Sequence, residues 1–568
     1  MPKSFKYVPK SLVNQIMGFY GDAVGSGQIA AVAVVGECIL SLDSSEAIVE
    51  ALAIVRSFQP RFMSYTKVLD ERNCILLAVE KWVFERDVDG GFLGEALAEK
   101  MIFPYIPLAD KDYLHNQEIR LKKRLVQELL ENLVLEFPEL SYSLRIKPEY
   151  FMQEAMMNRA RLFPPMVDNV LSFLHLETGN RSKDSVMNGY LKALKELKEE
   201  GLVESSEEGC VTISRDFVEK IQVKKTRFVN IFKTARRALF TSMLGTFSKT
   251  LGLVSQGKRT FPDLGRNLWS NSESIHQFED SHKYLYIPTA RGLFPLALKM
   301  DIEAFARKVL SKGKEPTIET RKIGGVLNDV YLLETFVNHK EEKIVVKRFK
   351  DWSSFKWFPI NLWTLGTKTF AVLGNSRMER ECAMNQLLRE KGINVPEILF
   401  VSHAERLVFM EHVEGEKLHE TIKRISGAAE DVEEDLSIIA RVGATLAEVH
   451  SLGIVLGDTK PENIVVQEES RDIYLLDLEQ ASRKGDKVWD IAEFLYYSGH
   501  YFSPISGTRL AELTAKAFVK GYIGKHGDAG LVQRVGSPKY TKVFSLFTFP
   551  HIILAISKIC RSEETAEN

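Results

Sequence analysis

The sequence predicts a multidomain α+β protein. With 568 residues, the chain is long enough for several domains, and its 45% apolar and 27% charged residues are ordinary for a globular protein. Its first part alternates apolar, strand-like runs with amphipathic helices, whereas its second half begins with strands around a glycine turn and continues with helical patterns. We therefore divide the chain into an α/β region with a helical extension at residues 1–164, a helix-rich module at 165–222, a basic segment and linker at 223–285, and a C-terminal domain at 286–568.

The most informative stretch is Leu456–Asn463, which is followed by a second Asp, Asp477, at the end of an apolar run. Transfer of a phosphoryl group needs a carboxylate beside the attacking hydroxyl, a cation near the transferred phosphate and oxygen ligands for Mg²⁺. The spacing predicts that Asp458 orients the acceptor hydroxyl, that Lys460 reaches the phosphate, and that Asn463 and Asp477 hold the metal. The alternative is a surface turn, since Gly-Asp and Lys-Pro are common loop dipeptides.

A nucleotide-binding hairpin is predicted further upstream. Residues Thr320–Leu333 form a strand, a glycine turn with Gly324 and Gly325, and a second strand, and Lys343–Phe349 form a third strand that carries Lys347. A glycine pair alone usually only makes a turn. Its distance from a strand lysine is the stronger signal, because the turn must approach phosphate while the lysine contacts the α- and β-phosphates.

The next segments supply a partner for this lysine and a hinge. Residues Arg380–Leu388 are expected to form a helix with an acid in its first turns, and Glu381 is the preferred partner of Lys347, with Glu379 as the alternative. The run Leu407–Gly415 predicts a buried strand that continues into a hinge, where backbone groups pair with adenine. The hinge residues expected to contact the nucleotide are Met410, Glu411 and Val413.

Taken in order, these features resemble the protein-kinase-like fold over roughly residues 286–540. The resemblance implies a bilobal C-terminal domain that uses ATP and Mg²⁺. In Leu456–Asp458 the usual His-Arg-Asp is Leu-Gly-Asp, and in Asp477–Glu479 the usual Asp-Phe-Gly is Asp-Leu-Glu. These departures are similar to the atypical branch: the RIO kinases, the small kinase of the KEOPS tRNA-modification complex, and the aminoglycoside and choline phosphotransferases. By this resemblance Asp490 holds the catalytic loop, and the alternative is a helix N-cap.

The chain has no room for a long activation segment between Asp477 and Val488–Ala492. In regulated kinases that segment is the switch and the substrate platform, so a constitutively formed site is expected. We expect a serine/threonine protein kinase. The alternatives are a small-molecule or lipid-linked kinase, or an ATPase, of the aminoglycoside-phosphotransferase type, and a pseudokinase scaffold that acts through its N-terminal half.

The region 1–164 faintly resembles the minimal nucleotidyltransferase fold, in which a Gly-Ser turn precedes an Asp-x-Asp on the next strand. Here Val35–Glu37 and Asp87–Asp89 occupy comparable places, but the Gly-Ser is missing and the register differs. A binding or scaffolding domain derived from such a fold is therefore preferred to an active nucleotidyltransferase.

The module at 165–222 shows a helix, a turn, a second helix and a hairpin, which resembles a winged helix with Met187–Glu200 as its recognition helix. Lys192, Lys195 and Lys198 on this helix are suited to phosphate. The predicted wing, however, carries three acids that would repel a nucleic-acid backbone. DNA binding is therefore unexpected, and a protein partner is preferred; the acids are Glu204, Glu207 and Glu208.

Residues 221–262 contain nine Lys or Arg and no Asp or Glu. An apolar stripe with basic flanks suits a peripheral membrane contact or RNA, and the alternative is a packed amphipathic helix that leads into a linker. A second unusual segment is the aromatic cluster at 352–370, for which a lid, a partner groove, a membrane-facing edge and an extension of the small-lobe core remain open.

Charge and cysteine usage limit the remaining classes. A formal net charge of −1 gives no whole-molecule attraction to nucleic acid or anionic membranes, so such binding must be local. The five cysteines are scattered, with no CxxC, which favours reduced, mostly buried thiols in a cytoplasmic protein. The longest apolar stretch, Phe544–Ile556, is interrupted by Pro550 and is expected to form a core helix instead of a membrane span.

Overall fold

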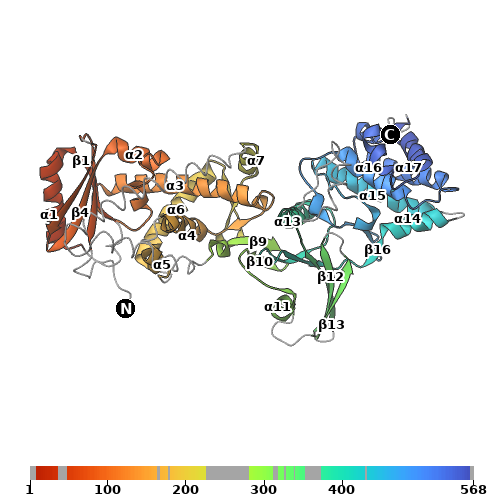
Figure 1. Ribbon diagram of the computed structural model, residues 1–568, viewed down its shortest axis with the longest axis horizontal. Coiled ribbons are helices and arrows are strands. Elements are labelled where there is room, and N and C mark those ends of the chain that lie inside the picture. Colours follow the sequence, from red (N-terminus) through yellow and green to blue (C-terminus); the bar gives the residue numbers. More distant parts are fainter. Residues whose placement is uncertain are drawn as a thin grey trace. The chain divides into compact units, whose positions relative to one another are not determined.

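Two compact units make up the chain, Met1–Tyr286 and Ile287–Asn568 (Figure 1). Each is described by itself. The computed structural model describes residues 8–35, 48–59, 61–162, 167–176, 180–224, 280–310, 317–324, 328–337, 340–351, 373–428 and 432–562. Gly325, the aromatic cluster 352–370 and most of the basic segment 221–262 therefore lie outside the described residues.

The first unit begins with a five-stranded sheet in the order β3-β4-β2-β1-β5. Only β2 and β4 run parallel; the other neighbours are antiparallel. Every residue of the central strand β2 is buried, as expected for a strand covered on both faces. The strands are β1 (Ile29–Val35), β2 (Val49–Val55), β3 (Phe62–Leu69), β4 (Arg72–Glu80) and β5 (Ile106–Ala109).

Helix α1 (Lys10–Tyr20) packs against one face of this sheet (Figure 1). Its buried residues recur at four-residue spacing, Leu12, Ile16 and Tyr20, so one stripe faces the strands. The Tyr20 hydroxyl donates to the carbonyl oxygens of Ala51 and Leu77 at 2.9 and 3.0 Å. Burial raises the pKa of Tyr20, so this hydroxyl stays protonated and keeps its role as a donor.

Helices and a small sheet complete the first unit. The predicted order of helix, helix and hairpin over 165–222 is present, although the hairpin joins further strands in the order β9-β6-β8-β7. Whether this module is a winged helix stays a prediction. The elements are α2 (Lys81–Gly90), α3 (Lys111–Glu136), β6 (Arg145–Ile146), α4 (Pro148–Leu162), α5 (Val167–Leu174), α6 (Arg181–Glu199), β7 (Val203–Ser205), β8 (Val211–Ile213), α7 (Arg215–Lys224) and β9 (Leu285–Thr289), whose last residues belong to the second unit.

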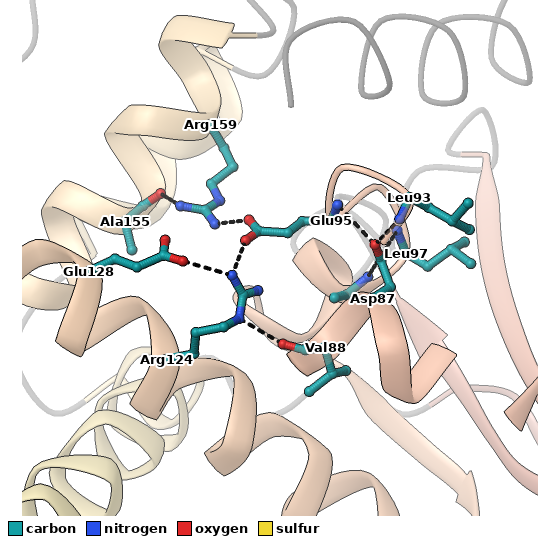
Figure 2. A network of polar contacts seen from close by, with 10 residues as sticks. Asp87, Val88, Leu93, Glu95, Leu97, Arg124, Glu128, Ala155 and Arg159 are labelled. Carbon is teal, nitrogen blue, oxygen red and sulfur yellow. Dashed lines mark hydrogen bonds and ion pairs between the residues drawn. The ribbon is translucent and has the colours of Figure 1, made fainter. Parts of the chain in front are cut away.

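Asp87, near the end of α2, is fully buried and holds the loop that follows it (Figure 2). Its carboxylate accepts the backbone N–H groups of Leu93 and Glu95 at 2.7 and 3.0 Å, and those of Leu97 and Ala98 at 3.1 and 3.0 Å. Burial raises the pKa of Asp87, while these four donors act in the opposite direction. Both oxygens of the carboxylate thus accept hydrogen bonds from the backbone, so Asp87 has a structural role.

Glu95 connects the same loop to two helices (Figure 2). Its carboxylate lies 2.6 Å from Arg124 Nη1 on α3 and pairs with Arg159 on α4. Arg124 also donates to the carbonyl oxygen of Val88 at 2.8 Å. Because a buried carboxylate needs such partners, this network fixes the sheet to the helices that follow it.

In the second unit, a five-stranded antiparallel sheet has the order β11-β12-β13-β15-β14. Phe305, Phe400 and Phe409 pack together beneath it, with ring centroids 4.1 to 5.6 Å apart. The elements are β10 (Gly292–Pro295), α11 (Ile302–Phe305), β11 (Thr317–Gly324), β12 (Asp329–Val337), β13 (Lys340–Arg348), α13 (Gly374–Glu390), β14 (Ile398–Ser402) and β15 (Leu407–Glu411).

The rest of this unit is mainly helical and surrounds a second core (Figure 1). A small sheet in the order β16-β17-β18 lies beside the helices. The elements are β16 (Gly415–Lys417), α14 (Leu418–Gly427), α15 (Glu433–Ser451), β17 (Ile464–Gln467), β18 (Ile473–Leu475), α16 (Lys487–Gly499), α17 (Thr508–Gly524), α18 (Ala529–Arg534), α19 (Pro538–Phe544) and α20 (Pro550–Arg561).

Helices α15 and α17 approach unusually closely. A Cβ added at Gly521 would lie 1.8 Å from the Ala440 oxygen, and one added at Gly443 would lie 2.2 Å from the Phe518 oxygen. Only glycine allows this contact, which fixes the helix that leads into the catalytic loop. The expected core helix at Phe544–Ile556 was partly wrong, because α19 ends at Phe544 and α20 begins at Pro550, where the proline takes the first helical position.

Two further expectations can be compared with the described residues. Four cysteines, Cys74, Cys210, Cys382 and Cys560, are buried and free, as predicted. Among the helices that the structure describes, none combines the length and the apolar character needed to cross a bilayer.

Candidate functional site

Lys347 lies near the end of β13, opposite Val330 of β12 and Val408 of β15. Its Nζ is 3.2 Å from Glu381 Oε1 and 3.0 Å from Asp477 Oδ1. The predicted pair of Lys347 and Glu381 is therefore present, and the alternative Glu379 instead has His403 Nε2 at 3.9 Å. Helix α13 begins at Gly374, earlier than expected, so Glu381 stands two turns into the helix instead of in its first turns.

At Lys347 and Glu381, burial and the neighbouring charges shift the pKa in opposite directions. Burial lowers the pKa of Lys347, but Asp477 and Glu381 raise it more, so the net shift is upward and the lysine is a cation. Burial raises the pKa of Glu381 to about 7, against the effect of Lys347. The site thus combines a permanent cation with a carboxylate that titrates near neutral pH.

The predicted nucleotide-binding backbone is described in part. Gly324 is the last residue of β11 and pairs with Val330, whereas Gly325 lies outside the described residues. Met410 and Glu411 are the last residues of β15, and Val413 lies half-buried in the short connection to β16. The Glu411 N–H donates to the Glu397 oxygen at 2.8 Å, so this N–H is occupied by the chain itself.

The catalytic loop lies between α15 and β17. Lys460 Nζ is 2.8 Å from Asp458 Oδ1, and the Asn463 side-chain nitrogen donates to the Asp458 backbone oxygen at 3.1 Å. Burial lowers the pKa of Lys460, but Asp458 raises it more, and the lysine remains charged. The loop therefore brings a carboxylate, a cation and an amide close together, within six consecutive residues.

Asp477 follows β18 and has φ 58°, in the left-handed region that an Asp rarely adopts. The N–H of the preceding residue, Leu476, donates to the Asn463 oxygen at 2.8 Å, which fixes the backbones of the two predicted metal ligands together. One small hollow, lined mostly by apolar side chains, has Asp458, Asn463 and Asp477 among its lining residues. Strained residues of this kind occur at functional sites because the surroundings enforce them.

Asp490 of α16 accepts hydrogen bonds from the backbone of the predicted catalytic loop. Its carboxylate accepts the N–H of Leu456 at 2.6 Å and that of Gly457 at 2.7 Å, and it lies 3.2 Å from His450 Nε2. The N-cap of α16 is Asp486 instead, which accepts from the Val488 N–H. The N-cap alternative for Asp490 was therefore wrong, and the contact implied by the resemblance is present.

Sequence reasoning missed a buried cluster beside this site. Arg377 on α13 is fully buried, and its Nη1 lies 3.1 Å from Glu479 Oε1 and 2.8 Å from Asn328 Oδ1. Asn328 also donates to Glu479. The signal was a polar stripe at four-residue spacing, Arg377, Glu381 and Asn385, whose members are all buried. A polar stripe on the buried face of a helix indicates a polar network.

The residues present fit Mg²⁺ bound together with a nucleotide. Asp477 and Asn463 supply carboxylate and amide oxygens, the ligand atoms this ion prefers. Within the described ranges, no group of three or more His, Cys, Asp or Glu side chains could hold a metal. A nucleotide-bound Mg²⁺ needs fewer protein ligands, because phosphate and water supply the rest.

Part of the second unit matches a known protein family. Residues 364–504 match the family described as "Protein kinase domain". The C-terminal part of the chain contains a protein kinase domain. The matched segment includes Glu381, the hinge, Asp458, Asn463 and Asp477, while the glycine turn and Lys347 precede it.

Curated relatives match a part of the chain. The chain is similar to "KEOPS complex subunit Bud32" of Pyrococcus abyssi, with 30% identity over 105 residues, which cover 18% of this chain and 44% of that protein. It is also similar to "EKC/KEOPS complex subunit bud32" of Dictyostelium discoideum, with 22% identity over 124 residues, covering 22% and 49% of the two chains. The chain thus spans slightly less than half the length of these relatives.

Solved structures that match part of the chain include WaaP in complex with acyl carrier protein, at 12% identity and a TM-score of 0.27, covering 42% of this chain and 97% of that one. The PknI kinase domain of Mycobacterium tuberculosis matches at 14% identity and a TM-score of 0.24, covering 43% and 96%.

Proposed function

We propose that this protein is an ATP- and Mg²⁺-dependent phosphotransferase. The observation that carries the proposal is the position of Lys347, which contacts both Glu381 and Asp477 while Asp477, Asp458 and Asn463 line one hollow. A phosphoryl transfer depends on positioning and on charge stabilisation, and this arrangement supplies both.

Each side chain has a role in this proposal. Lys347 neutralises the α- and β-phosphates, and Asp477 and Asn463 hold the metal, which neutralises charge on the transferred group. Asp458 accepts the hydrogen bond of the acceptor hydroxyl and orients its oxygen. Lys460, next to Asp458, neutralises charge on the transferred phosphate. The backbone from Met410 to Val413 pairs with adenine.

We propose protein serine or threonine as the acceptor. The kinase-domain match supports it, and so does the similarity to subunits of the KEOPS complex, from which we infer that this protein also works with protein partners in the cytoplasm. A small-molecule acceptor is the second candidate. The Asp-Leu-Glu in place of Asp-Phe-Gly and the short segment Leu478–Asp486 favour it.

The test is phosphate transfer from γ-labelled ATP with Mg²⁺ by the intact chain, with and without generic protein acceptors. Asp458→Ala and Asp477→Ala remove the two acids in question. Asp472→Ala is a matched control, because this exposed carboxylate in the same unit contacts only Arg441 at 3.4 Å among the ion pairs of the described residues.

Label on protein that is lost in the first two variants and kept in the control supports the protein kinase. Label in a small molecule or free phosphate, with the same dependence, supports the second candidate or an ATPase. ATP binding without any transfer contradicts the proposed phosphotransferase and favours a scaffold. Transfer that survives both substitutions contradicts the roles proposed for Asp458 and Asp477.

A further inference from the structure

A cavity of about 790 Å³ lies in the first unit and is lined by residues of that unit. It opens between the segment Phe103–Pro107, the start of α3 and the middle of α6. Its volume is in the range of small-molecule sites. The part of the chain that forms it, where α3 packs along α6, belongs to one compact unit.

A chain of polar contacts that runs from the surface into the interior forms one wall of the cavity. Lys192 Nζ lies 2.6 Å from His115 Nε2, and His115 Nδ1 lies 3.1 Å from Glu118 Oε2. Glu118 is buried and lies 2.5 Å from Lys122 Nζ, which is fully buried, and it accepts from the Tyr105 hydroxyl at 2.9 Å. With Glu118 negative, His115 donates from Nδ1 and accepts from Lys192 at Nε2.

This chain of contacts positions Lys192 in advance. Burial lowers the pKa of Lys122, but Glu118 acts in the opposite direction, and Lys122 also donates to the Val186 oxygen at 2.8 Å. A Cβ at Gly189 would lie 2.5 Å from Glu118 Oε1 and 2.7 Å from Lys122 Nζ, so only glycine gives α6 room above the pair. Lys192 itself is exposed, and its contact with the partly exposed His115 reduces the freedom that its side chain has to lose when it binds a ligand.

The charges and surfaces of the cavity define its ligand. Lys111, Lys192 and Lys195 carry positive charge at the cavity, while Asp112 is negative and Glu118 is already paired with Lys122. Tyr105, Phe103 and Leu191 add aromatic and apolar surface, and the Leu191 side chain is 45% exposed. Net positive charge beside apolar surface suits an anion with a flat or apolar body.

We propose that this cavity binds a small phosphorylated molecule of the nucleotide type. Lys192 and Lys195 contact its phosphate, and the wall of the cavity that contains Tyr105 contacts its base. The residues of this site all belong to the first unit, whereas the proposed ATP site belongs to the second.

Nucleic acid fits this face less well. On the same helix, Lys198 donates to Ser205 of the hairpin, and Glu196 and Glu200 pair with Lys123 of α3 at 3.0 and 2.6 Å. One side of α6 is thereby covered by α3 and cannot enter a groove. The two lysines at the cavity are the ones left for a smaller anion.

The experiment uses the full chain without Mg²⁺ and three kinds of probe: inorganic pyrophosphate, the four common nucleoside 5′-monophosphates, and a duplex oligonucleotide. Acylation of lysines, read by mass spectrometry, reports which lysines each probe protects, and calorimetry gives the affinity. The variant Lys192→Gln/Lys195→Gln tests the site. Lys198→Gln is the matched control, because it removes a lysine from the same helix outside the cavity.

We expect a monophosphate to protect Lys192 and Lys195 but not Lys198, and the double variant to bind it about tenfold or more weakly, with Lys198→Gln unchanged. Protection by pyrophosphate but by no nucleoside monophosphate overturns the nucleotide assignment. So does protection by a duplex oligonucleotide alone. Failure of every probe to bind up to about 10 mM, or equal weakening by Lys198→Gln, also overturns the proposal. Circular dichroism of each variant verifies that it is folded.

Discussion

Arg377 and Glu479 form an ion pair of 3.1 Å inside the kinase domain, where the arginine side chain is fully buried and the glutamate side chain is 4% exposed. The pair joins α13, which carries Glu381, to the segment that begins with Asp477. Lys347 contacts both of these acids. The pair therefore links the helix to the segment that carries Asp477, the predicted metal ligand.

Removal of one partner should be costly because the other charge remains buried. We expect Arg377→Met to lower the free energy of unfolding by about 3–5 kcal/mol. The double variant Arg377→Met/Glu479→Met should lose less than Arg377→Met alone, since it leaves no unpaired charge. Urea unfolding followed by circular dichroism measures both. A loss in the double variant that is equal to or larger than the loss in Arg377→Met would show that the residues do not act as a pair.

Replacement of Lys347 should abolish transfer while the fold persists. We expect Lys347→Met to reduce the rate about 100-fold or more, because the charge that neutralises the phosphates is lost. Lys343→Met is the control, since Lys343 lies on the same strand and its nearest acids, Glu341 and Glu414, are 3.4 and 3.9 Å away at the surface. Initial rates with labelled ATP measure the effect, and an equal loss in the control would count against the assigned role.

The raised pKa of Glu381 predicts a dependence of stability on pH. The carboxyl titrates near 4.5 in an unfolded chain and at about 7 in the fold, so between these values the unfolded state releases its proton first. The stabilisation from protonated Glu381 is present below pH 4.5 and is lost as the pH rises through 7. Glu381→Gln should remove this loss, so the variant gains stability relative to the wild type between pH 4.5 and 7. Chemical unfolding at several pH values measures it; parallel curves would contradict the shift.

Asp490 is a positioning residue, because it acts through the loop that carries Asp458. Asp490→Asn leaves one of the two backbone donors, Leu456 or Gly457, without an acceptor, which costs about 1–3 kcal/mol. We expect kcat to fall about tenfold or more while KM for ATP changes little. Asp486→Asn alters the cap of the same helix and should leave kcat unchanged. A rise in KM without a change in kcat would place Asp490 outside this role.

Asp87 and Asp89 should differ sharply in their effect on stability. Asp87→Ala leaves four buried backbone N–H groups without an acceptor and should lower the free energy of unfolding by about 3 kcal/mol or more. Asp89→Ala breaks an exposed pair with Arg120 and should cost at most about 1 kcal/mol. Neither should alter phosphate transfer. Thermal unfolding measures the difference, and equal shifts would contradict the role of Asp87.

The sequence predicted those parts of the site in which residue type and spacing carry the information. Lys347 and Glu381 were paired in advance because a strand lysine and a helix acid have few other uses at that separation. The start of α13 was missed, since Gly374 is a poor helix former and the chain before it gives no cap signal. The link from Arg377 to Glu479 was missed because it joins residues 102 positions apart, and only the fold brings them together.

The N-terminal unit was harder to predict for a related reason. Asp87 and Asp89 look alike in sequence, and together they gave only the faint resemblance to a nucleotidyltransferase fold. The next loop turns its backbone N–H groups towards Asp87, whereas Asp89 lies at the surface beside Arg120. Backbone donors leave no mark in a side-chain pattern, so the different roles of the two acids could not be predicted from it.

The short connection from Asp477 to α16 limits the kinds of inhibitor that could act on this protein. Its middle is held in place, because Val455 and Ser482 exchange two backbone hydrogen bonds of 2.9 and 2.8 Å immediately before the catalytic loop. A compound that works by trapping a displaced activation segment would find no such segment here. Selectivity against this protein would have to come from the shape of the nucleotide cleft itself.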